Sequence, residues 1–191
     1  MTVEIREETA AALPEYSRVP IAFLVKSRFR VDLVRGGLGG LALVEEPVTP
    51  FVKDYDANRE VPRPVGWAVR WNIANWGILG AFDGEQRVGG AVIAWNTDGV
   101  DKLYGRTDLA VLWDLRVRPE RRGTGIGTRL FAHALAWARQ RQCREILIET
   151  QNINVPACRF YARQGCELGA INRYAYPDLP DETQLLWYKN V

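Results

Sequence analysis

The stretch Leu112–Leu130, with the sequence LWDLRVRPERRGTGIGTRL, decides the fold of this chain. It begins with an apolar segment that ends at Val117, and such a run predicts a buried strand. A short charged turn follows, and residues with helical spacing close the stretch. Between turn and helix, three glycines occupy alternate positions, at Gly123, Gly125 and Gly127. The sequence therefore predicts a strand, a glycine-rich turn and a helix in direct succession.

A turn of this kind is suited to bind an anion. Glycine adopts backbone conformations closed to other residues and lets main-chain N–H groups approach a ligand closely. The start of the following helix adds unpaired N–H groups and the positive end of the helix dipole. Phosphate is the anion that proteins most often hold in this way. The candidate contacts are the seven consecutive residues Arg122, Gly123, Thr124, Gly125, Ile126, Gly127 and Thr128.

Two common phosphate motifs do not fit the spacing. A P-loop closes with Gly-Lys-Ser/Thr, whereas Gly127 is followed by Thr128 and Arg129, so no lysine reaches a triphosphate. A dinucleotide fingerprint, G-x-G-x-x-G, follows its strand directly, whereas this chain has G-x-G-x-G several residues after one. Both interpretations are therefore weakened.

The run Arg122–Gly127, RGTGIG, matches the R/Q-x-x-G-x-G/A signature of the GCN5-related N-acetyltransferase (GNAT) superfamily, and Leu115–Pro119 resembles that family's strand entry. A second stretch, Asn154–Cys166, resembles the superfamily's N-x-x-A-x-x-x-Y-x-x-x-G-F segment, with Cys166 in place of the usual aromatic residue. We expect that change to alter packing and not chemistry. The resemblance implies acetyl-CoA as co-substrate, with no metal.

The same resemblance implies roles for single residues. The main chain of Leu115 and Val117 contacts the cofactor, and an N–H near Val117 meets the oxyanion of the tetrahedral intermediate. Asn154 contacts the pantetheine arm, although at a strand-to-helix junction its amide can also serve as a helix cap. Tyr161 lies near the sulfur, and a phenol of pKa near 10 can protonate a departing thiolate. The alternative is that Tyr161 is a core tyrosine.

Acetyl transfer to an amine also needs a group that takes up the amine's proton. Asp114 and Glu149 are the candidate bases, near the middle of one predicted strand and the end of the next. Strict alternation places Asp114 on one face with Leu112 and Arg116. Asp114 can therefore equally form an ion pair with Arg116, or bind a cationic substrate while water takes the proton.

Composition excludes several classes of protein. The chain has 191 residues, 47% of them hydrophobic, and a net charge of +2, which fits one folded domain and argues against a nucleic-acid partner. No apolar run is long enough to span a membrane, and the N-terminus is too acidic for a signal peptide. We expect a cytoplasmic protein without a membrane partner. Three cysteines, Cys143, Cys158 and Cys166, form no C-x-x-C pair and indicate buried thiols.

The order of predicted elements indicates an α/β or α+β fold. Strands are expected at residues 2–7, 77–82, 88–95, 109–117, 146–148, 167–176 and 184–189, with helices at 128–141 and 155–164. A hairpin is plausible around residues 29–44, while Pro14 is expected to stop a helix and proline density to exclude regular structure over 45–64. Residues 65–76 favour a helix over a strand.

This order matches the GNAT architecture, a mixed and twisted central sheet of about six or seven strands with helices on both faces. We expect one acetyltransferase domain over residues 1–191, with a catalytic core at about 77–191 and a variable, acceptor-side part at 1–76. The Trp-rich segment 65–76 could lie at the interface of a homodimer or in the core.

A narrower resemblance covers most of the chain and is weakest before residue 40. The runs VLWDLRV, ETQNINVPACRFYARQGCELGAINRYAY and ETQLLWYKN are similar to the streptothricin acetyltransferases. This resemblance implies a small cationic acceptor held by acidic and aromatic side chains, for which the sequence offers Glu45, Glu46, Asp54, Asp56, Trp67, Trp71, Asp114 and Tyr174. The alternatives are an acetyltransferase for a protein N-terminus or a polyamine, and a non-catalytic acyl-CoA-binding module.

Overall fold

The computed structural model describes residues 3–57 and 63–191. The chain divides into two compact units, one formed by residues 1–22, 54–148 and 188–191, the other by residues 23–53 and 149–187. Each unit combines residues from both sides of position 76. The larger sheet has the strand order β1-β4-β5-β6-β7-β9-β8, and a separate two-stranded sheet has the order β2-β3. The expectation of a mixed sheet of six or seven strands is confirmed.

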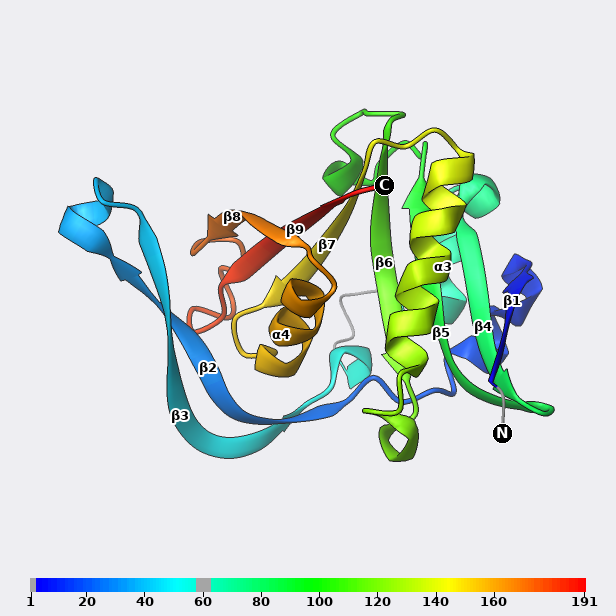
Figure 1. Ribbon diagram of the computed structural model, residues 1–191, viewed down its shortest axis with the longest axis horizontal. Helices are drawn as coiled ribbons and strands as arrows, with labels where there is room; N and C mark the ends of the chain where they lie inside the picture. The colour runs from blue at the N-terminus through cyan, green and yellow to red at the C-terminus, as the bar shows by residue number, and fades with distance from the viewer. Residues whose placement is uncertain (1–2, 58–62) are drawn as a thin grey trace. The chain divides into compact units, whose positions relative to one another are not determined.

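The first unit contains the strands that lead to the glycine turn (Figure 1). β1 (Glu4–Glu8), β4 (Gly77–Asp83), β5 (Gln86–Trp95) and β6 (Leu109–Val117) pair in antiparallel fashion, and β7 (Glu145–Gln151) continues the sheet parallel to β6. The predicted hairpin between β4 and β5 is confirmed, with Gly84 in its turn at a φ of 61°. The central strand β6 has the bounds expected from sequence.

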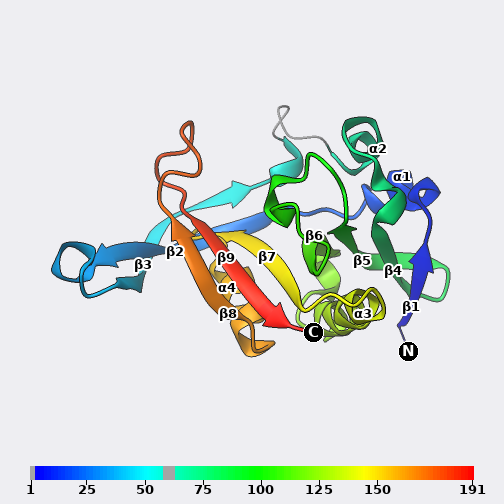
Figure 2. The ribbon, with the colours of Figure 1, turned by 90° about the horizontal axis from the view of Figure 1, so that it is seen from above.

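Helices cover both faces of this part of the sheet (Figure 2). A side-chain carbon on Gly89 of β5 would meet Leu130 of α3 (Ile126–Gln140), whereas one on the adjacent Gly90 would meet Tyr16 of α1 (Leu13–Tyr16). Successive residues of a strand point to opposite faces, so α3 and α1 pack on opposite sides. The inward face of α3 includes the residues with helical spacing in the sequence: Leu130, Ala134, Trp137 and Ala138.

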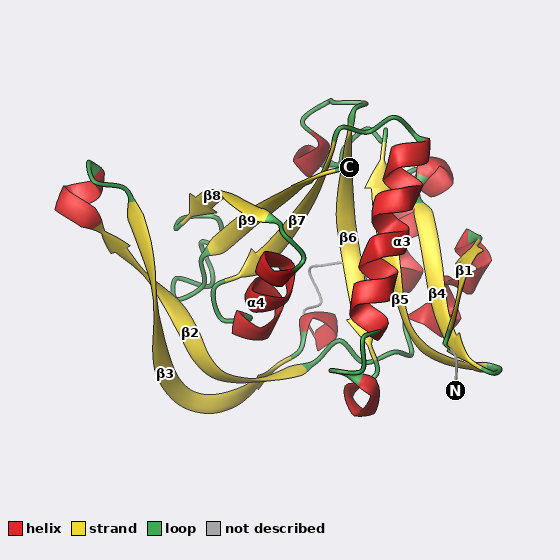
Figure 3. Ribbon diagram, in the orientation of Figure 1, coloured by secondary structure: helices red, strands yellow, loops and turns green. Residues whose placement is uncertain are grey.

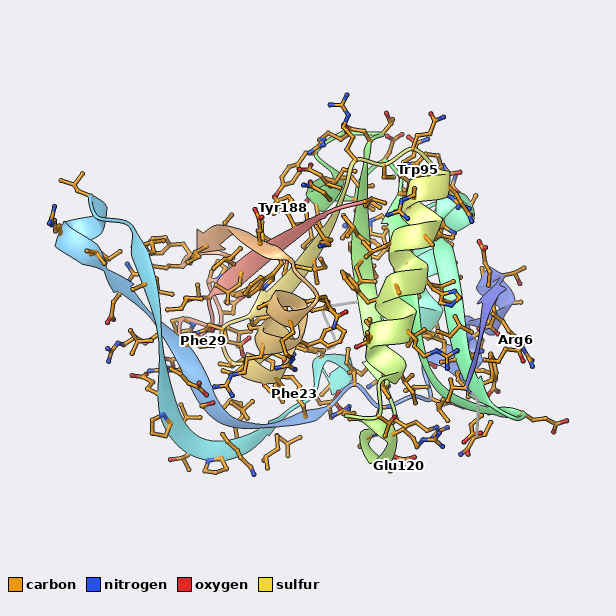
Figure 4. The ribbon with its side chains drawn as sticks, in the orientation of Figure 1. Arg6, Phe23, Phe29, Trp95, Glu120 and Tyr188 are labelled. Atoms are coloured by element: carbon orange, nitrogen blue, oxygen red, sulfur yellow. The ribbon has the colours of Figure 1, made fainter. Side chains whose placement is uncertain are left out.

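The second unit consists of a long hairpin and the C-terminal elements (Figure 3). β2 (Phe23–Leu33) and β3 (Leu41–Lys53) form the hairpin. α4 (Val155–Arg163), β8 (Glu167–Asn172) and β9 (Gln184–Asn190) follow. Phe29, labelled in Figure 4, is joined to Asn152 by two hydrogen bonds, one from its main-chain N–H and one from the Asn152 amide. This unit has its own hydrogen-bonded connections between segments far apart in sequence.

Two expectations about proline are wrong. Pro14 does not stop a helix but lies within the first turn of α1, where the missing N–H has no partner to lose. Pro47 and Pro50 do not exclude regular structure, because β3 runs through both to Lys53. A strand at the edge of a two-stranded sheet leaves one side of its backbone unpaired, so it tolerates residues without an N–H.

The remaining expectations concern short segments and the cysteines. Residues 65–76 contain only one short α-helix, α2 (Trp67–Arg70), between 3₁₀ turns, so the helix expectation is correct in part. Residues 58–62, within the proline-rich tract, lie outside the described residues. All three cysteines are free thiols and buried, as expected. Burial raises the pKa of Cys158 to about 11.

Candidate active site

The glycine turn has the backbone geometry that the sequence predicts. Gly123 and Gly125 adopt φ angles of 77° and 87°, in the left-handed region that favours glycine. Gly125 is the N-cap of α3, and the helical ladder starts with the N–H of Arg129, which donates to the Gly125 carbonyl at 3.1 Å. Glu120, labelled in Figure 4, lies on the turn just before. The chain thus enters a fifteen-residue helix through two glycine-dependent conformations.

This geometry leaves main-chain donors at the start of α3. In the described part of the chain, the N–H groups of Gly123, Gly125, Ile126 and Gly127 have no main-chain acceptor. The Thr124 hydroxyl donates to the Arg121 carbonyl at 2.7 Å, so this side chain closes the turn. Unpaired N–H groups and the helix dipole together favour an anion. The turn therefore retains the donor set of a phosphate site.

The Arg122 side chain stabilises the turn through carbonyl groups. Its guanidinium donates to the main-chain oxygens of Val117 at 3.0 Å, Ala22 at 2.9 Å and Pro20 at 3.2 Å. It thereby joins the end of β6 to the segment that follows α1. The motif reading named Arg122 among the cofactor contacts, and its side chain instead contributes by holding the turn in place.

The open edge of β6 provides further main-chain donors. Pairing of β6 with β7 runs from Leu109 to Leu112, opposite Glu145 to Ile148. On the other side, the N–H of Arg118 donates to Val88 of β5 at 2.9 Å. Main-chain groups alternate in direction along an antiparallel strand, so those of Leu115 and Val117 point away from β5. These are the two strand residues expected to contact the cofactor.

Asp114 forms a buried network with Arg116 and Tyr16. Its side chain is 7% exposed and that of Arg116 1%. Oδ1 accepts from the Tyr16 hydroxyl at 2.5 Å and from Arg116 Nε at 2.9 Å, while Oδ2 accepts from Arg116 at 2.5 Å. Arg116 also donates to Asp56 at 2.8 Å and to the Val19 carbonyl at 3.1 Å. Of the alternatives for Asp114, the structure shows the ion pair with Arg116.

The protonation states in this network follow from burial and charge. Burial raises the pKa of the Tyr16 phenol well above its usual value, and the Asp114 carboxylate raises it further, so Tyr16 remains a donor. Burial alone would lower the pKa of Arg116, but the carboxylate of Asp114 outweighs it and raises that pKa. The network is therefore a fixed cation held by carboxylates.

The expected alternation along β6 is interrupted before Asp114. Leu112 pairs with Ile93, but Asp114 pairs with Val92, so β6 has one extra residue, Trp113, at this point. A bulge of this kind shifts the faces of the residues that follow it. Leu112 and Asp114 therefore do not share a face, and this part of the alternation argument is wrong.

Replacing Asp114 by asparagine tests the structural role. We expect a loss of about 2–3 kcal/mol in the free energy of unfolding, near the lower end for a broken buried pair because Asp56 still accompanies Arg116. The turnover number of the folded variant should stay within about threefold of wild type, whereas loss of a general base costs about 10²-fold or more. Chemical denaturation and kinetics on the same sample measure both. A stable variant with little turnover would restore Asp114 as the base.

The second unit carries Asn154 and Tyr161. The Asn154 side chain caps α4, because its Oδ1 accepts from the Ala157 N–H at 3.2 Å. Tyr161 is only 7% exposed and its ring lies 5.0 Å from that of Phe160. Both residues are thus held firmly by α4, Asn154 at its start and Tyr161 within it.

Glu149, also in the second unit, accepts hydrogen bonds from neutral groups. Oε1 accepts from the Tyr176 hydroxyl at 2.7 Å, and Oε2 accepts from the Gln184 amide at 2.8 Å. The Tyr176 hydroxyl in turn accepts from the Gln151 amide at 2.8 Å. Asp114 has Arg116 as its neighbour, whereas these partners of Glu149 carry no charge. Glu149 is therefore the better placed of the two carboxylates to accept a proton.

Two tyrosines belong to these networks although the sequence did not single them out. Tyr16 lies 98 positions from Asp114 and Tyr176 lies 27 positions from Glu149. No local pattern reports contacts at such separations. Tyr176 stands within the stretch quoted for its resemblance, which is the only available signal.

The residues suggested for the acceptor have several partners within the chain. Glu45 pairs with Arg159, Glu46 with Arg28 and Arg30, and Asp56 with Arg116. The aromatic members fall into two places. Trp67 and Trp71 each stack near Trp76 in the first unit, while Tyr174 is 83% exposed in the second.

Searches for other kinds of site give negative results within the described residues. No group of three or more His, Cys, Asp or Glu side chains could hold a metal ion. In the same part of the chain, no helix is long and apolar enough to cross a membrane.

Comparisons with known proteins agree with the site geometry. A model described as the acetyltransferase (GNAT) family matches residues 45–166. The streptothricin acetyltransferase of Escherichia coli is 31% identical over 171 residues, which cover 87% of this chain and 84% of that protein. Streptothricin acetyltransferase A of Bacillus subtilis is 35% identical over 81 residues, covering 41% of this chain and 47% of that protein.

Solved structures show the same fold. A protein from Bacillus anthracis, assigned as a streptothricin acetyltransferase and solved in complex with acetyl coenzyme A, has a TM-score of 0.75 and 26% identity. The alignment covers 100% of this chain and 98% of that one. A nourseothricin acetyltransferase has a TM-score of 0.76 and 22% identity, over 100% and 99% of the two chains.

Proposed function

Because the chain belongs to the acetyltransferase (GNAT) family, we propose that it transfers the acetyl group of acetyl-CoA to an amine of a streptothricin-type antibiotic. The observation that carries the choice of acceptor is the 31% identity, over 87% of the chain, to a streptothricin acetyltransferase. Acetyl-CoA as co-substrate is supported by the similar Bacillus anthracis protein, which was solved with that compound. A cytoplasmic location fits both molecules.

In this proposal the first unit binds and orients the co-substrate. The N–H groups of Gly123, Gly125, Ile126 and Gly127 bind the diphosphate, with Arg122 keeping the turn in place. The outward main-chain groups of Leu115 and Val117 hold the acyl-pantetheine arm in the manner of an added strand. The Val117 N–H then donates to the oxygen that becomes negative when the amine attacks.

The second unit supplies the proton transfers. Glu149 accepts the proton of the acceptor ammonium, which frees the nitrogen lone pair. The nitrogen forms a bond to the acetyl carbon, and collapse of the tetrahedral intermediate breaks the carbon–sulfur bond. Tyr161 donates its hydroxyl proton to the departing thiolate and recovers a proton from solvent. Asn154 fixes the start of α4 and, through its amide, the pantetheine arm.

The direct test follows coenzyme A thiol released from acetyl-CoA with a panel of amines. Streptothricin should give the highest kcat/KM, with spermidine and a peptide with a free N-terminus far lower. Preference for the peptide or spermidine would favour one of the other acetyltransferase functions. No thiol release with any amine, despite coenzyme A binding, would favour a non-catalytic acyl-CoA-binding module.

Replacing Gly125 by alanine tests the phosphate site. A side-chain carbon at Gly125 meets no atom within 4 Å, so the effect must come from the backbone, where a φ of 87° costs a non-glycine residue about 1–3 kcal/mol. Relaxation of the turn should misalign the N–H groups and raise the KM for acetyl-CoA about tenfold.

Gly84→Ala is the matched control for that variant. Gly84 also has a positive φ, 61°, and open space around it, but it lies in the β4–β5 turn. It should lose stability similarly while the KM for acetyl-CoA stays at the wild-type value. Equal KM values for the two variants would show that residues 122–128 do not hold the diphosphate.

A further inference from the structure

A cleft of about 550 Å³ opens in the second unit and has no role in the steps above. β2, residue 152 and the segment from residue 173 to residue 183 line it. Its charged and aromatic lining residues are Arg28, Arg30, Arg173, Tyr174, Tyr176 and Asp181. The cleft is large enough for part of a small-molecule ligand.

The cations of the cleft differ in how far they are neutralised. Arg28 pairs with Glu46 at 2.8 Å and with Asp181 at 3.2 Å, and Arg30 pairs with Asp32 at 2.7 Å. Arg173 forms no ion pair with any residue that the structure describes, and its guanidinium lies 5.9 Å from the Tyr174 ring. Its five N–H donors are therefore available to a ligand.

This donor set selects for oxygen atoms. A guanidinium has no acceptor and carries a positive charge, so it binds hydroxyl, amide or carboxylate oxygens and repels an ammonium group. The exposed ring of Tyr174, beside Arg173, offers an apolar face for a ring of the ligand. The open side of the cleft is thus suited to the oxygen-rich part of a molecule and not to its amines.

One wall of the cleft leads to the candidate base. Tyr176 lines the cleft, and its hydroxyl donates to Glu149 at 2.7 Å. A ligand held by Arg173 and Tyr174 would therefore lie within one side chain of Glu149. The cleft combines a donor-rich region for oxygen atoms with access to a carboxylate that can accept an amine's proton.

From this arrangement, and on the basis of the function proposed above, we propose that the cleft is the acceptor-binding site. It holds the hydroxyl and amide oxygens of the acceptor at Arg173 and Tyr174, while the amine to be acetylated lies toward Glu149. This arrangement predicts selection for an acceptor that combines an amine with an oxygen-rich body. A linear polyamine satisfies only half of the site.

The experiment measures the binding of streptothricin by calorimetry to protein saturated with coenzyme A, which has no acetyl group to transfer. Arg173→Gln should weaken the affinity about tenfold, because a charge-assisted hydrogen bond is lost. In kinetic assays the KM for the acceptor should rise by a similar factor, with the KM for acetyl-CoA unchanged. Arg173 is exposed, so the substitution leaves folding intact.

Arg35→Gln is the matched control, since it makes the same change of charge at an exposed residue of the same unit, in the hairpin turn away from the cleft lining. It should leave the affinity unchanged. Equal affinity of wild type and Arg173→Gln, or an equal loss in both variants, overturns the cleft proposal. Streptothricin binding that depends on Arg173 without thiol release from acetyl-CoA would support the cleft and overturn the proposed function.

Discussion

Replacing Tyr161 by phenylalanine is expected to lower kcat about 10²-fold, the effect of losing a general acid, with less than about twofold change in the KM for acetyl-CoA. The substitution removes one oxygen and keeps the ring, which is packed in the second unit at 7% exposure. Loss of the proton donor should therefore slow departure of the thiolate without disturbing cofactor binding. Steady-state release of coenzyme A thiol measures both constants.

A tyrosine without a proposed catalytic role supplies the control for Tyr161. Tyr188, a half-buried residue on β9, makes the same loss of a hydroxyl when it is replaced by phenylalanine, and its kcat should remain at the wild-type value. Thermal unfolding of both variants separates a folding defect from a catalytic one. If Tyr161→Phe turns over at the wild-type rate, Tyr161 is a core residue only.

Replacing Glu149 by glutamine is expected to lower kcat/KM for the acceptor by about 10²-fold and to remove the dependence on pH that an essential base imposes. Glutamine keeps an oxygen for the Tyr176 hydroxyl, which donates to Glu149 at 2.7 Å in the wild type. Its amide cannot take up a proton near neutral pH. The pH profile of kcat/KM is the decisive measurement, because a purely structural residue would lower the rate without changing the shape of the curve.

Glu167→Gln is the control for Glu149, since Glu167 is an exposed carboxylate in the same unit, on β8. Its pH profile should match that of wild type. If Glu149→Gln also keeps the wild-type profile, proton removal belongs to water or to another group. Combined with the Asp114→Asn result, the measurement distinguishes the two carboxylates.

The sequence was sufficient for the elements whose signal is local. The alternating glycines, the apolar run of β6 and the helical spacing of Leu130, Ala134 and Trp137 each depend on neighbouring residues, and all three predictions are confirmed. The errors at Pro14, Pro47 and Pro50 have a common cause. Proline costs stability only where an N–H is needed, and whether it is needed depends on the first turn of a helix or the free edge of a strand.

The candidate site was less predictable because its contacts are distant in sequence. Spacing could place Asp114 beside Arg116, but not the extra residue that the bulge inserts before Asp114, nor the hydroxyl of Tyr16. Likewise, motif resemblance named Arg122, but only the structure shows that its guanidinium binds three carbonyl groups. Side-chain partners of this kind are set by tertiary packing.

The burial of all three cysteines has a consequence for an enzyme whose product is a thiol. Free coenzyme A readily oxidises to disulfides, and such a disulfide is attacked only by an accessible thiolate. Cys158, with a pKa of about 11, is almost wholly protonated at neutral pH, and Cys143 and Cys166 are 6% and 7% exposed. The protein can thus accumulate its own product under oxidising conditions without being linked to it covalently.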